Sequence, residues 1–328
     1  MTNFPINTPL GLGDLLDRVF RLYRLHASKM LLAVAIFIVP LGILSALLVQ
    51  DATANAFFML RDLIETGEPQ VRQNDTSIWA ILLTPLAFIM QAFVSLISAQ
   101  LTIDALHGRL TTVAGALRTA AGKFFPYLGM VILMGLAMSM IVVVVAIIGF
   151  IFAFVFAAFF AVIASAAPSN FGNDTSVALA IGIGVIVVLL YVGAILLFAS
   201  PFLYFYGRWS VSLPVVLAEE QGPAGALGRS WNLTKSNGRR AMGYVLLAYL
   251  LSYVVVGTPA NVLQFVIGFA LPADSQWLTV ALISGISVIA NVLTSPISSI
   301  AYVLFYYELR VRNESYDLAL QLASPEVA

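Results

Sequence analysis

The sequence predicts an all-α membrane protein with six transmembrane helices in three parallel helix-hairpin units, each preceded by an amphipathic interfacial helix. Composition is the first observation behind this prediction. Of the 328 residues, 61% are apolar and 10% are charged, whereas ordinary soluble domains are about 45–50% apolar and about 25% charged. The apolar residues also form long blocks, and a membrane-spanning helix needs about 20 of them. Residues 1–328 are therefore interpreted as one polytopic membrane domain.

Six apolar blocks define the expected spans. They cover residues 30–49, 78–103, 125–167, 176–206, 241–270 and 277–307. The block at 125–167 could hold two crossings, because as one helix it would be about 64 Å long, roughly twice the hydrocarbon thickness. The charge pattern requires one crossing there, so we expect a single long helix that tilts, bends near Gly149 or projects beyond the bilayer.

Lysine and arginine indicate the orientation of the spans. With residues 1–29 inside and six crossings, fourteen of the sixteen basic residues lie on the inner side, and only Arg61 and Arg72 lie outside. This asymmetry is the positive-inside pattern of membrane proteins. Lys123 and Arg208 both belong inside, so an even number of crossings separates them. The charge pattern therefore predicts that both termini lie in the cytoplasm.

A basic amphipathic segment comes before three of the spans. Residues 10–29 alternate apolar and basic faces at helical spacing, residues 223–240 repeat the pattern, and a weaker copy precedes the third span. Such helices lie in the membrane interface, with the apolar face on the acyl boundary and basic side chains toward lipid phosphates. The candidate contacts with lipid headgroups and the interface are Arg18, Arg21, Arg24, Arg229, Lys235, Phe20 and Trp231.

Spans two and six each carry a stripe of uncharged polar residues at helical spacing. Every acidic or basic residue falls in a loop or at a span end, which argues against an ion-coupled carrier with a carboxylate near the midplane. The stripes either join the helices by hydrogen bonds, which is the simpler interpretation, or line a polar cavity for a small or lipidic ligand. The candidate cavity residues are Gln91, Ser95, Ser98, Ser287, Asn291 and Ser295.

Residue types that serve catalysis or metal binding are scarce. The chain has no cysteine, which excludes disulfides, thiolate metal sites and a cysteine nucleophile. Its two histidines, His26 and His107, each stand beside a basic stretch at the expected inner face, without a cluster of carboxylates. We therefore expect no catalytic residue, no metal and no cofactor.

Proline marks one expected irregularity. The stretch GTPAN at residues 257–261 is predicted to break span five, because proline removes a backbone donor and kinks a helix. Residues 262–270 would then lie near the outer surface.

Three segments of the chain carry a resemblance to a known family. These are the opening TPLGLGDLLDRVFRLYRLH, the central LPVVLAEEQGPAGALGRSWNLTKSNGRRAMGYVLL and the closing SPISSIAYVLFYYELRVRNESYDL. In the same order they resemble the bacterial membrane domain that is fused to some glycerophosphodiester phosphodiesterases and that also occurs alone. The resemblance implies six spans with interfacial helices in the bacterial cytoplasmic membrane. It does not imply the phosphodiesterase activity, which needs paired histidines and several carboxylates around a metal.

Two classes of function follow from these features. The first is a non-enzymatic integral membrane protein that contacts anionic lipids or a membrane partner through its basic interfacial helices. The alternative is a transporter or lipid-handling protein with a polar cavity between spans two and six. The expected partners are membrane lipids and either another membrane protein or a second copy of the chain, but no nucleic acid.

The topology can be tested with reporter fusions. Fusions after Asp75, Asp174 and Asp274 should report the outside, and fusions after Lys123, Arg240 and Ala328 should report the cytoplasm, because the basic loops are retained inside. An inside signal at Asp174 alone would mean that the block at 125–167 does not cross once.

Overall fold

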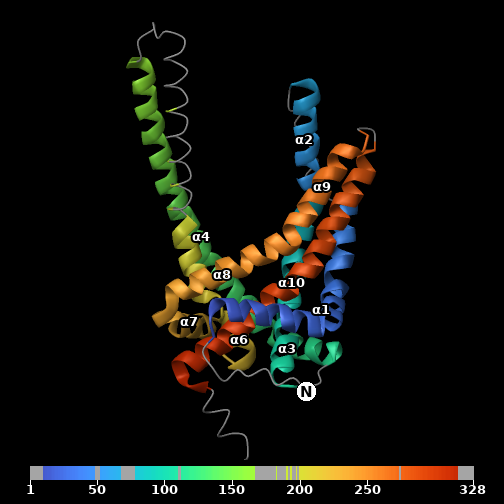
Figure 1. Ribbon diagram of the computed structural model, residues 1–328, viewed down its shortest axis with the longest axis vertical. Coiled ribbons are helices and arrows are strands. Elements are labelled where there is room, and N and C mark those ends of the chain that lie inside the picture. The colour runs from blue at the N-terminus through green and yellow to red at the C-terminus, as the bar shows by residue number, and fades with distance from the viewer. Residues whose placement is uncertain are drawn as a thin grey trace, which may run out of the picture.

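The computed structural model describes residues 10–48, 52–67, 78–109, 112–166, 199–272 and 275–316, together with residues 182, 190, 193 and 197. Every regular element in these ranges is helical (Figure 1). The α-helices are α1 (Leu12–Leu48), α2 (Ala52–Thr66), α3 (Ile78–Leu106), α4 (Val113–Ala166), α6 (Ser212–Ala218), α7 (Pro223–Thr234), α8 (Gly238–Ser252), α9 (Thr258–Ala270) and α10 (Gln276–Glu314). A 3-10 helix, η1 (Lys235–Asn237), and a π-helix, η2 (Tyr253–Gly257), connect neighbouring elements.

Five helical stretches of the described chain are long and apolar enough to cross a membrane. They are Leu12–Leu47, Ile81–Leu106, Val113–Phe152, Pro223–Ala270 and Gln276–Glu314. Large apolar side chains on α4, such as Phe125, Met140 and Phe150, are 71–79% exposed, as suits contact with lipid. The chain is thus an all-α, multi-pass membrane protein. The span predicted at 176–206 lies mostly outside the described residues, although residues 199–209 are helical.

The first interfacial segment and the first span form one helix, α1. Figure 1 shows the first half of α1 running across the base of the molecule and the second half rising from it. Leu15, Val19 and Leu22 on the first half are fully buried in the protein core. The prediction that this apolar face lies on the acyl boundary is therefore wrong for these three residues, because they pack in the protein core. Its basic face remains outward.

The long apolar block and the weak third copy of the repeat also join into one helix, α4. It continues through Gly149 without a break, and its 54 residues correspond to about 81 Å at the rise of an α-helix. The second interfacial segment, in contrast, is divided, because α7 ends at Thr234 and η1 separates it from α8.

The predicted break in span five is a π-helical turn. Thr258 donates its backbone N–H to the carbonyl of Tyr253, five residues earlier, which is the bonding pattern of a π-helix. Pro259 has no N–H to donate, so the regular pattern cannot hold there. The widened turn absorbs the proline, and α8 and α9 follow one another as an oblique rod across the molecule (Figure 1).

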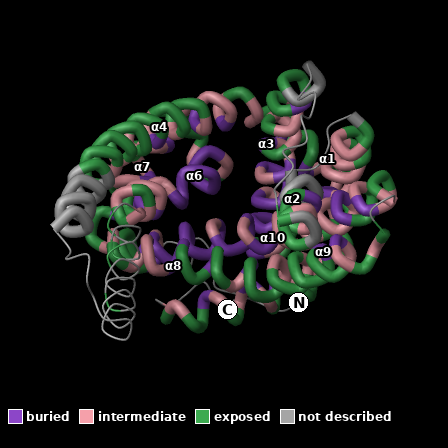
Figure 2. The backbone as a smooth tube through the Cα atoms, turned by 90° about the horizontal axis from the view of Figure 1, so that it is seen from above, coloured by how far each residue is buried: buried purple, intermediate pink, exposed green. Residues whose placement is uncertain are grey.

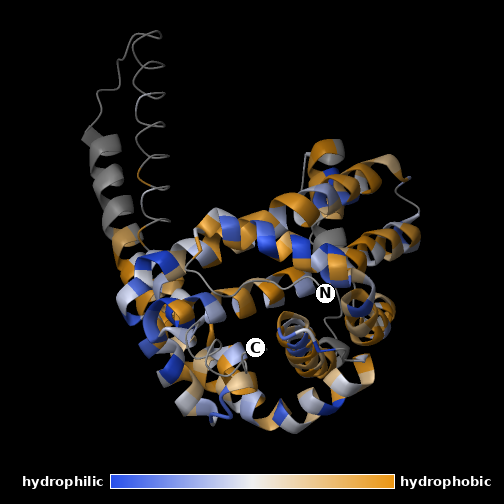
Figure 3. Cartoon of the chain, turned by 60° about the horizontal axis from the view of Figure 1, so that its bottom comes forward, coloured by the Kyte–Doolittle hydropathy of each residue, from blue (hydrophilic) through white to orange (hydrophobic). Residues whose placement is uncertain are grey.

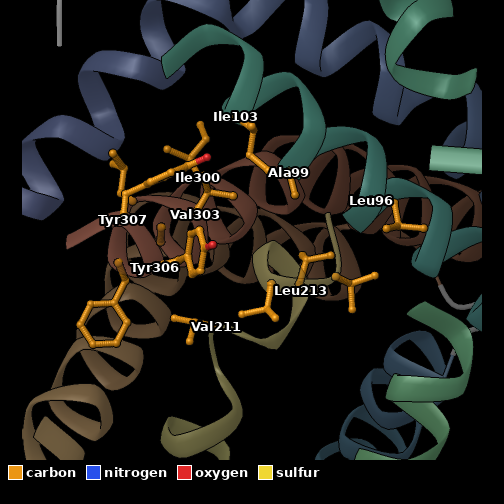
Figure 4. Close-up of a cluster of buried hydrophobic side chains, with 14 of the residues drawn as sticks. Leu96, Ala99, Ile103, Val211, Leu213, Ile300, Val303, Tyr306 and Tyr307 are labelled. Atoms are coloured by element: carbon orange, nitrogen blue, oxygen red, sulfur yellow. The ribbon is translucent and has the colours of Figure 1, made fainter. Parts of the chain in front are cut away.

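The core lies at the base, where α3, α6 and α10 meet. Figure 2 shows buried residues gathered on α6 and α10, while much of α4 is exposed. Figure 3 shows that hydrophilic residues gather on the helices at the base, whereas segments away from it are mostly hydrophobic. The central cluster (Figure 4) contains Leu96, Ala99 and Ile103 of α3, Val211 and Leu213 at α6, and Ile300, Val303, Tyr306 and Tyr307 of α10.

Candidate binding site

Two adjoining cavities lie along the polar stripes of α3 and α10. The first, here called the apolar cavity, has a volume of about 600 Å3 and lies between α1, α3 and α10. Most of its lining is apolar, including Leu41, Phe88 and Val288. The second, here called the hydroxyl chamber, has a volume of about 460 Å3. Both volumes fall in the range of about 300–1,000 Å3 that is typical of ligand pockets.

The hydroxyl chamber brings together α3, α4, residues 206–213 and α10. Ten of its lining residues carry a hydroxyl group, and among the residues that the structure describes none in the lining is Asp, Glu, Lys, Arg or His. The hydroxyl-bearing residues are Ser95, Tyr127, Tyr206, Ser210, Ser212, Thr294, Ser295, Ser298, Ser299 and Tyr302. The chamber is therefore polar but carries no formal charge in its lining.

Two of the predicted cavity residues, Gln91 and Asn291, line both spaces. Both side chains are exposed, although each lies well inside a membrane-spanning helix. A polar group that faces hydrocarbon is costly, and the cavities give these two amides polar surroundings. The apolar cavity and the hydroxyl chamber thus adjoin at Gln91 and Asn291, and the pair is here called the groove.

The structure brings five of the six predicted stripe residues to the groove. Ser95 and Ser295 line the hydroxyl chamber and Ser287 lines the apolar cavity, beside Gln91 and Asn291. The sixth, Ser98, is fully buried in α3 packing and is not part of either lining, which corrects that assignment. Ser98 lies on the same side of α3 as Gln91 but two turns closer to the base, where consecutive residues of α3 are buried on every side.

The stripes make hydrogen bonds within their own helices. Ser95 donates to the carbonyl of Gln91 at 2.9 Å, and Ser295 donates to the carbonyl of Asn291 at 2.8 Å. The amide of Asn291 donates to the carbonyl of Ser287 at 2.9 Å. Ser287 also accepts a hydrogen bond from the amide of Gln264 on α9 at 2.9 Å, as the simpler interpretation expects. None of these bonds connects α3 with α10, so this part of the two stripes agrees with the cavity interpretation.

Sequence patterns missed the aromatic part of the chamber. Tyr127, Tyr206, Trp209 and Tyr302 line it from three different segments, and the hydroxyls of Tyr206 and Tyr302 lie 3.2 Å apart. In the sequence the three tyrosines lie inside apolar blocks and Trp209 lies just after one, so all four count as apolar residues. A possible signal was Tyr302, which follows Ser295 and Ser298 along the same stripe of α10.

The basic residues predicted on α1 differ in exposure, and their contact with lipid stays a prediction. Arg21 and Arg24 are exposed, whereas Arg18 and Phe20 are half-buried. Because the opposite face of α1 is buried in the core, α1 cannot rotate about its axis to bury its basic face.

The predicted contacts of the second segment are engaged within the protein. Arg229 forms ion pairs with Glu219 at 2.7 Å and with Glu314 at 2.5 Å, which joins α7 to the ends of α6 and α10. The guanidinium of Arg208 lies 4.1 Å from the ring centre of Trp231, a cation–π arrangement. Both predicted side chains are half-buried, while Lys235 is exposed. A lipid contact for Arg229 and Trp231 stays a prediction.

Glu219 is the centre of this ion-pair cluster. Burial would raise the pKa of its carboxyl group, but hydrogen bonds from Arg229 and Tyr306 and the positive charges of Arg229 and Arg310 outweigh burial. The pKa of Glu219 therefore lies below its ordinary value. Tyr306 donates to the carboxylate at 2.8 Å, which links the cluster to the core.

A second ion-pair cluster lies around Glu308, whose side chain has no exposed surface. Arg312 pairs with it at 2.7 Å and Arg240 at 3.0 Å. Arg240 also donates to the backbone carbonyl of Leu10, just before α1 begins.

The two histidines lie at the base, apart from the groove. His26 borders a small cavity of about 50 Å3 with Asp104 and Arg109, and Nδ1 of His107 lies 2.8 Å from the carbonyl of Ile103. Among the residues that the structure describes, there is no group of three His, Cys, Asp or Glu placed to hold a metal ion.

The fold and the groove define a multi-pass helical membrane protein with an internal polar space. The chain belongs to the family described as a domain of unknown function, DUF7847, whose model matches residues 25–309. No curated protein and no solved structure matches it.

The role of Glu219 can be tested by the pH dependence of stability. Because its pKa is lowered on folding, its stabilising effect is complete above the ordinary value of 4.5 and is lost as the pH falls through the folded-state pKa. We expect Glu219→Gln to lower the thermal unfolding temperature at pH 7 in detergent, and the difference from wild type to shrink below pH 4.5. The control is Glu220→Gln, because Glu220 is 82% exposed and an exposed pair contributes little. A difference that does not change with pH would contradict this assignment.

Proposed function

We propose that this protein binds an amphipathic molecule in the groove between α3 and α10 and acts as a lipid-handling protein or transporter. The observation that carries this proposal is the exposure of Gln91 and Asn291 inside membrane-spanning helices, where an apolar cavity meets a chamber rich in hydroxyl groups. An amphipathic molecule has an apolar part that fits the apolar cavity and a polar part that fits the hydroxyl chamber. If the helices formed a purely structural bundle, neither the apolar cavity nor the hydroxyl chamber would have a role.

The arrangement of the helices suits entry from the bilayer. Figure 1 shows α4 diverging from α9 and α10 above their shared base. The apolar cavity is lined by α1, α3 and α10 within stretches that can span the membrane, so its surroundings are hydrocarbon. A ligand that is already dissolved in the bilayer could reach the groove without crossing water.

The placement in a cell belongs to the same proposal. Six spans in three parallel hairpins, with both termini in the cytoplasm of a bacterium, agree with the distribution of lysine and arginine and with the resemblance to the phosphodiesterase membrane domain. In that orientation the hydroxyl chamber lies in the inner half of the bilayer, because α10 runs from the outer side to the charged base.

Filling the apolar cavity should lower the amount of bound lipid. Ala87 lines this cavity, so Ala87→Trp places a bulky ring where a hydrocarbon chain would lie. We expect the purified variant to retain at least threefold less extractable lipid per protein after extensive detergent washing, as measured by mass spectrometry.

Leu136→Trp is the matched control, because Leu136 on α4 is 60% exposed and does not line the groove. Both variants are compared at unfolding temperatures close to that of wild type. Equal lipid retention by the two tryptophan variants would overturn the groove as a binding site.

We also propose that the basic face of α1 contacts anionic lipids. The observation behind it is that Leu15, Val19 and Leu22 are fully buried while Arg21 and Arg24 are exposed. Packing holds these two guanidinium groups on the surface at the base, where each basic residue near an anionic leaflet contributes about 1 kcal/mol.

The double change of Arg21 and Arg24 to Gln tests this contact. We expect it to reduce the preference of the protein for spin-labelled phosphatidylglycerol over phosphatidylcholine at least fivefold. High salt should reduce the preference of the wild type in the same direction, because it screens exposed charges. A wild-type protein that shows no such preference would contradict the proposal.

A further inference from the structure

Most hydroxyl groups of the hydroxyl chamber already use their proton within the protein, and the amides of Gln91 and Asn291 add donors at its edge. Six of its hydroxyl groups donate their proton to a backbone carbonyl three or four residues earlier. They belong to Ser95, Ser210, Ser212, Thr294, Ser295 and Ser299. A hydroxyl has one donor and two acceptor lone pairs. Since the donors are used within the protein, these six groups present lone pairs as acceptors. The ligand that they recognise is therefore a hydrogen-bond donor.

The charge of the chamber narrows the ligand further. The described part of its lining has no carboxylate to neutralise a cation and no basic side chain to pair with an anion. The nearby Arg208 is buried, and its guanidinium is directed to the ring of Trp231 and to the carbonyl of Thr234 at 2.6 Å, neither of which lines the chamber. A phosphate or carboxylate would also face the lone pairs of the hydroxyl groups. The headgroup that fits is uncharged.

Aromatic residues complete the lining of the chamber. Tyr127, Trp209 and Tyr302 place aromatic rings in the lining beside polar groups. A polyol has C–H surfaces between its hydroxyls, so it can contact ring faces while its O–H groups donate to the serines and threonine. A simple hydrocarbon could not form hydrogen bonds with the hydroxyl groups of the chamber.

The second cavity adds a hydrocarbon chain to this headgroup. Along α10, the lining of the groove extends from Ser284 to Tyr302, which is about 27 Å at the rise of an α-helix. The apolar cavity occupies the part before Asn291 and the hydroxyl chamber the part after it. On the basis of the proposed lipid-handling function, we infer that the ligand is a neutral lipid with a polyol headgroup, such as a monoacylglycerol or a glycolipid. Its headgroup lies in the hydroxyl chamber and its chain in the apolar cavity.

A series of amphiphiles with one chain length and different headgroups tests this inference. The full-length protein is placed in phosphatidylcholine nanodiscs, because alkyl glycoside detergents carry a polyol headgroup and would compete. The probes are monomyristoylglycerol, myristate at pH 8 and tetradecyltrimethylammonium, with free glycerol as a fourth. We expect monomyristoylglycerol to bind at least tenfold more tightly than the two charged probes, and glycerol to bind far more weakly.

The paired change of Ser95 and Ser295 to Ala identifies the source of the preference. It removes two acceptors, one on α3 and one on α10, and should reduce the affinity for monomyristoylglycerol at least fivefold with little effect on the charged probes. The control is Ser139→Ala, because Ser139 makes the same kind of backbone hydrogen bond on the exposed face of α4, outside the groove.

Each outcome decides between the two proposals. Equal affinity for all three headgroups, combined with the loss of lipid in Ala87→Trp, would overturn the polyol inference and leave the groove as a general lipid site. Binding of glycerol as tight as that of monomyristoylglycerol would overturn the role of the chain. Absence of binding by every probe, together with unchanged lipid retention in Ala87→Trp, would overturn the proposed function itself.

Discussion

The carboxylate of Glu308 holds the base of the molecule together. It is completely buried and pairs with Arg240 at the start of α8 and Arg312 at the end of α10, while Arg240 also binds the backbone just before α1. Three segments distant in sequence are thereby joined at one point. An isolated buried carboxylate costs several kcal/mol, so neither arginine can move away without a large penalty. Because α10 also supplies a wall of the groove, the geometry of the hydroxyl chamber depends on this ion-pair cluster.

The sequence predicted the membrane class and most of the polar wall, because both depend on the period of a single helix. A polar residue every three or four positions in an apolar span marks a side of the helix, and five of the six residues chosen this way line the groove. Ser98 has the right period but lies where α3 enters the core and is buried on every side, and the period of one helix does not show how deep each turn is buried. Tyr127, Tyr206 and Trp209 could not be assigned, because helices distant in sequence bring them to the chamber and single-helix patterns carry no information about neighbours.

The same distinction applies to the interfacial segments. The hydrophobic side of residues 12–23 must be buried. The sequence does not distinguish burial in lipid from burial in protein, because both surroundings are apolar. In the folded chain Leu15, Val19 and Leu22 meet protein, which fixes the direction of α1 as well as its depth. Likewise, a basic residue before a span can meet a phosphate or a carboxylate. Arg229 meets two carboxylates because Glu219 and Glu314, far apart in sequence, both converge on it.

The length of α4 couples the groove to its surroundings. Its large exposed apolar residues extend from Phe125 to Phe154, about 44 Å along the helix axis, which exceeds a hydrocarbon layer of about 30 Å. Such hydrophobic mismatch is relieved by tilting. The foot of α4 carries Tyr127, Met130 and Met134, which form one wall of the hydroxyl chamber. A thicker bilayer needs less tilt and would rotate this wall relative to α10. The width of the hydroxyl chamber would then change with the thickness of the membrane.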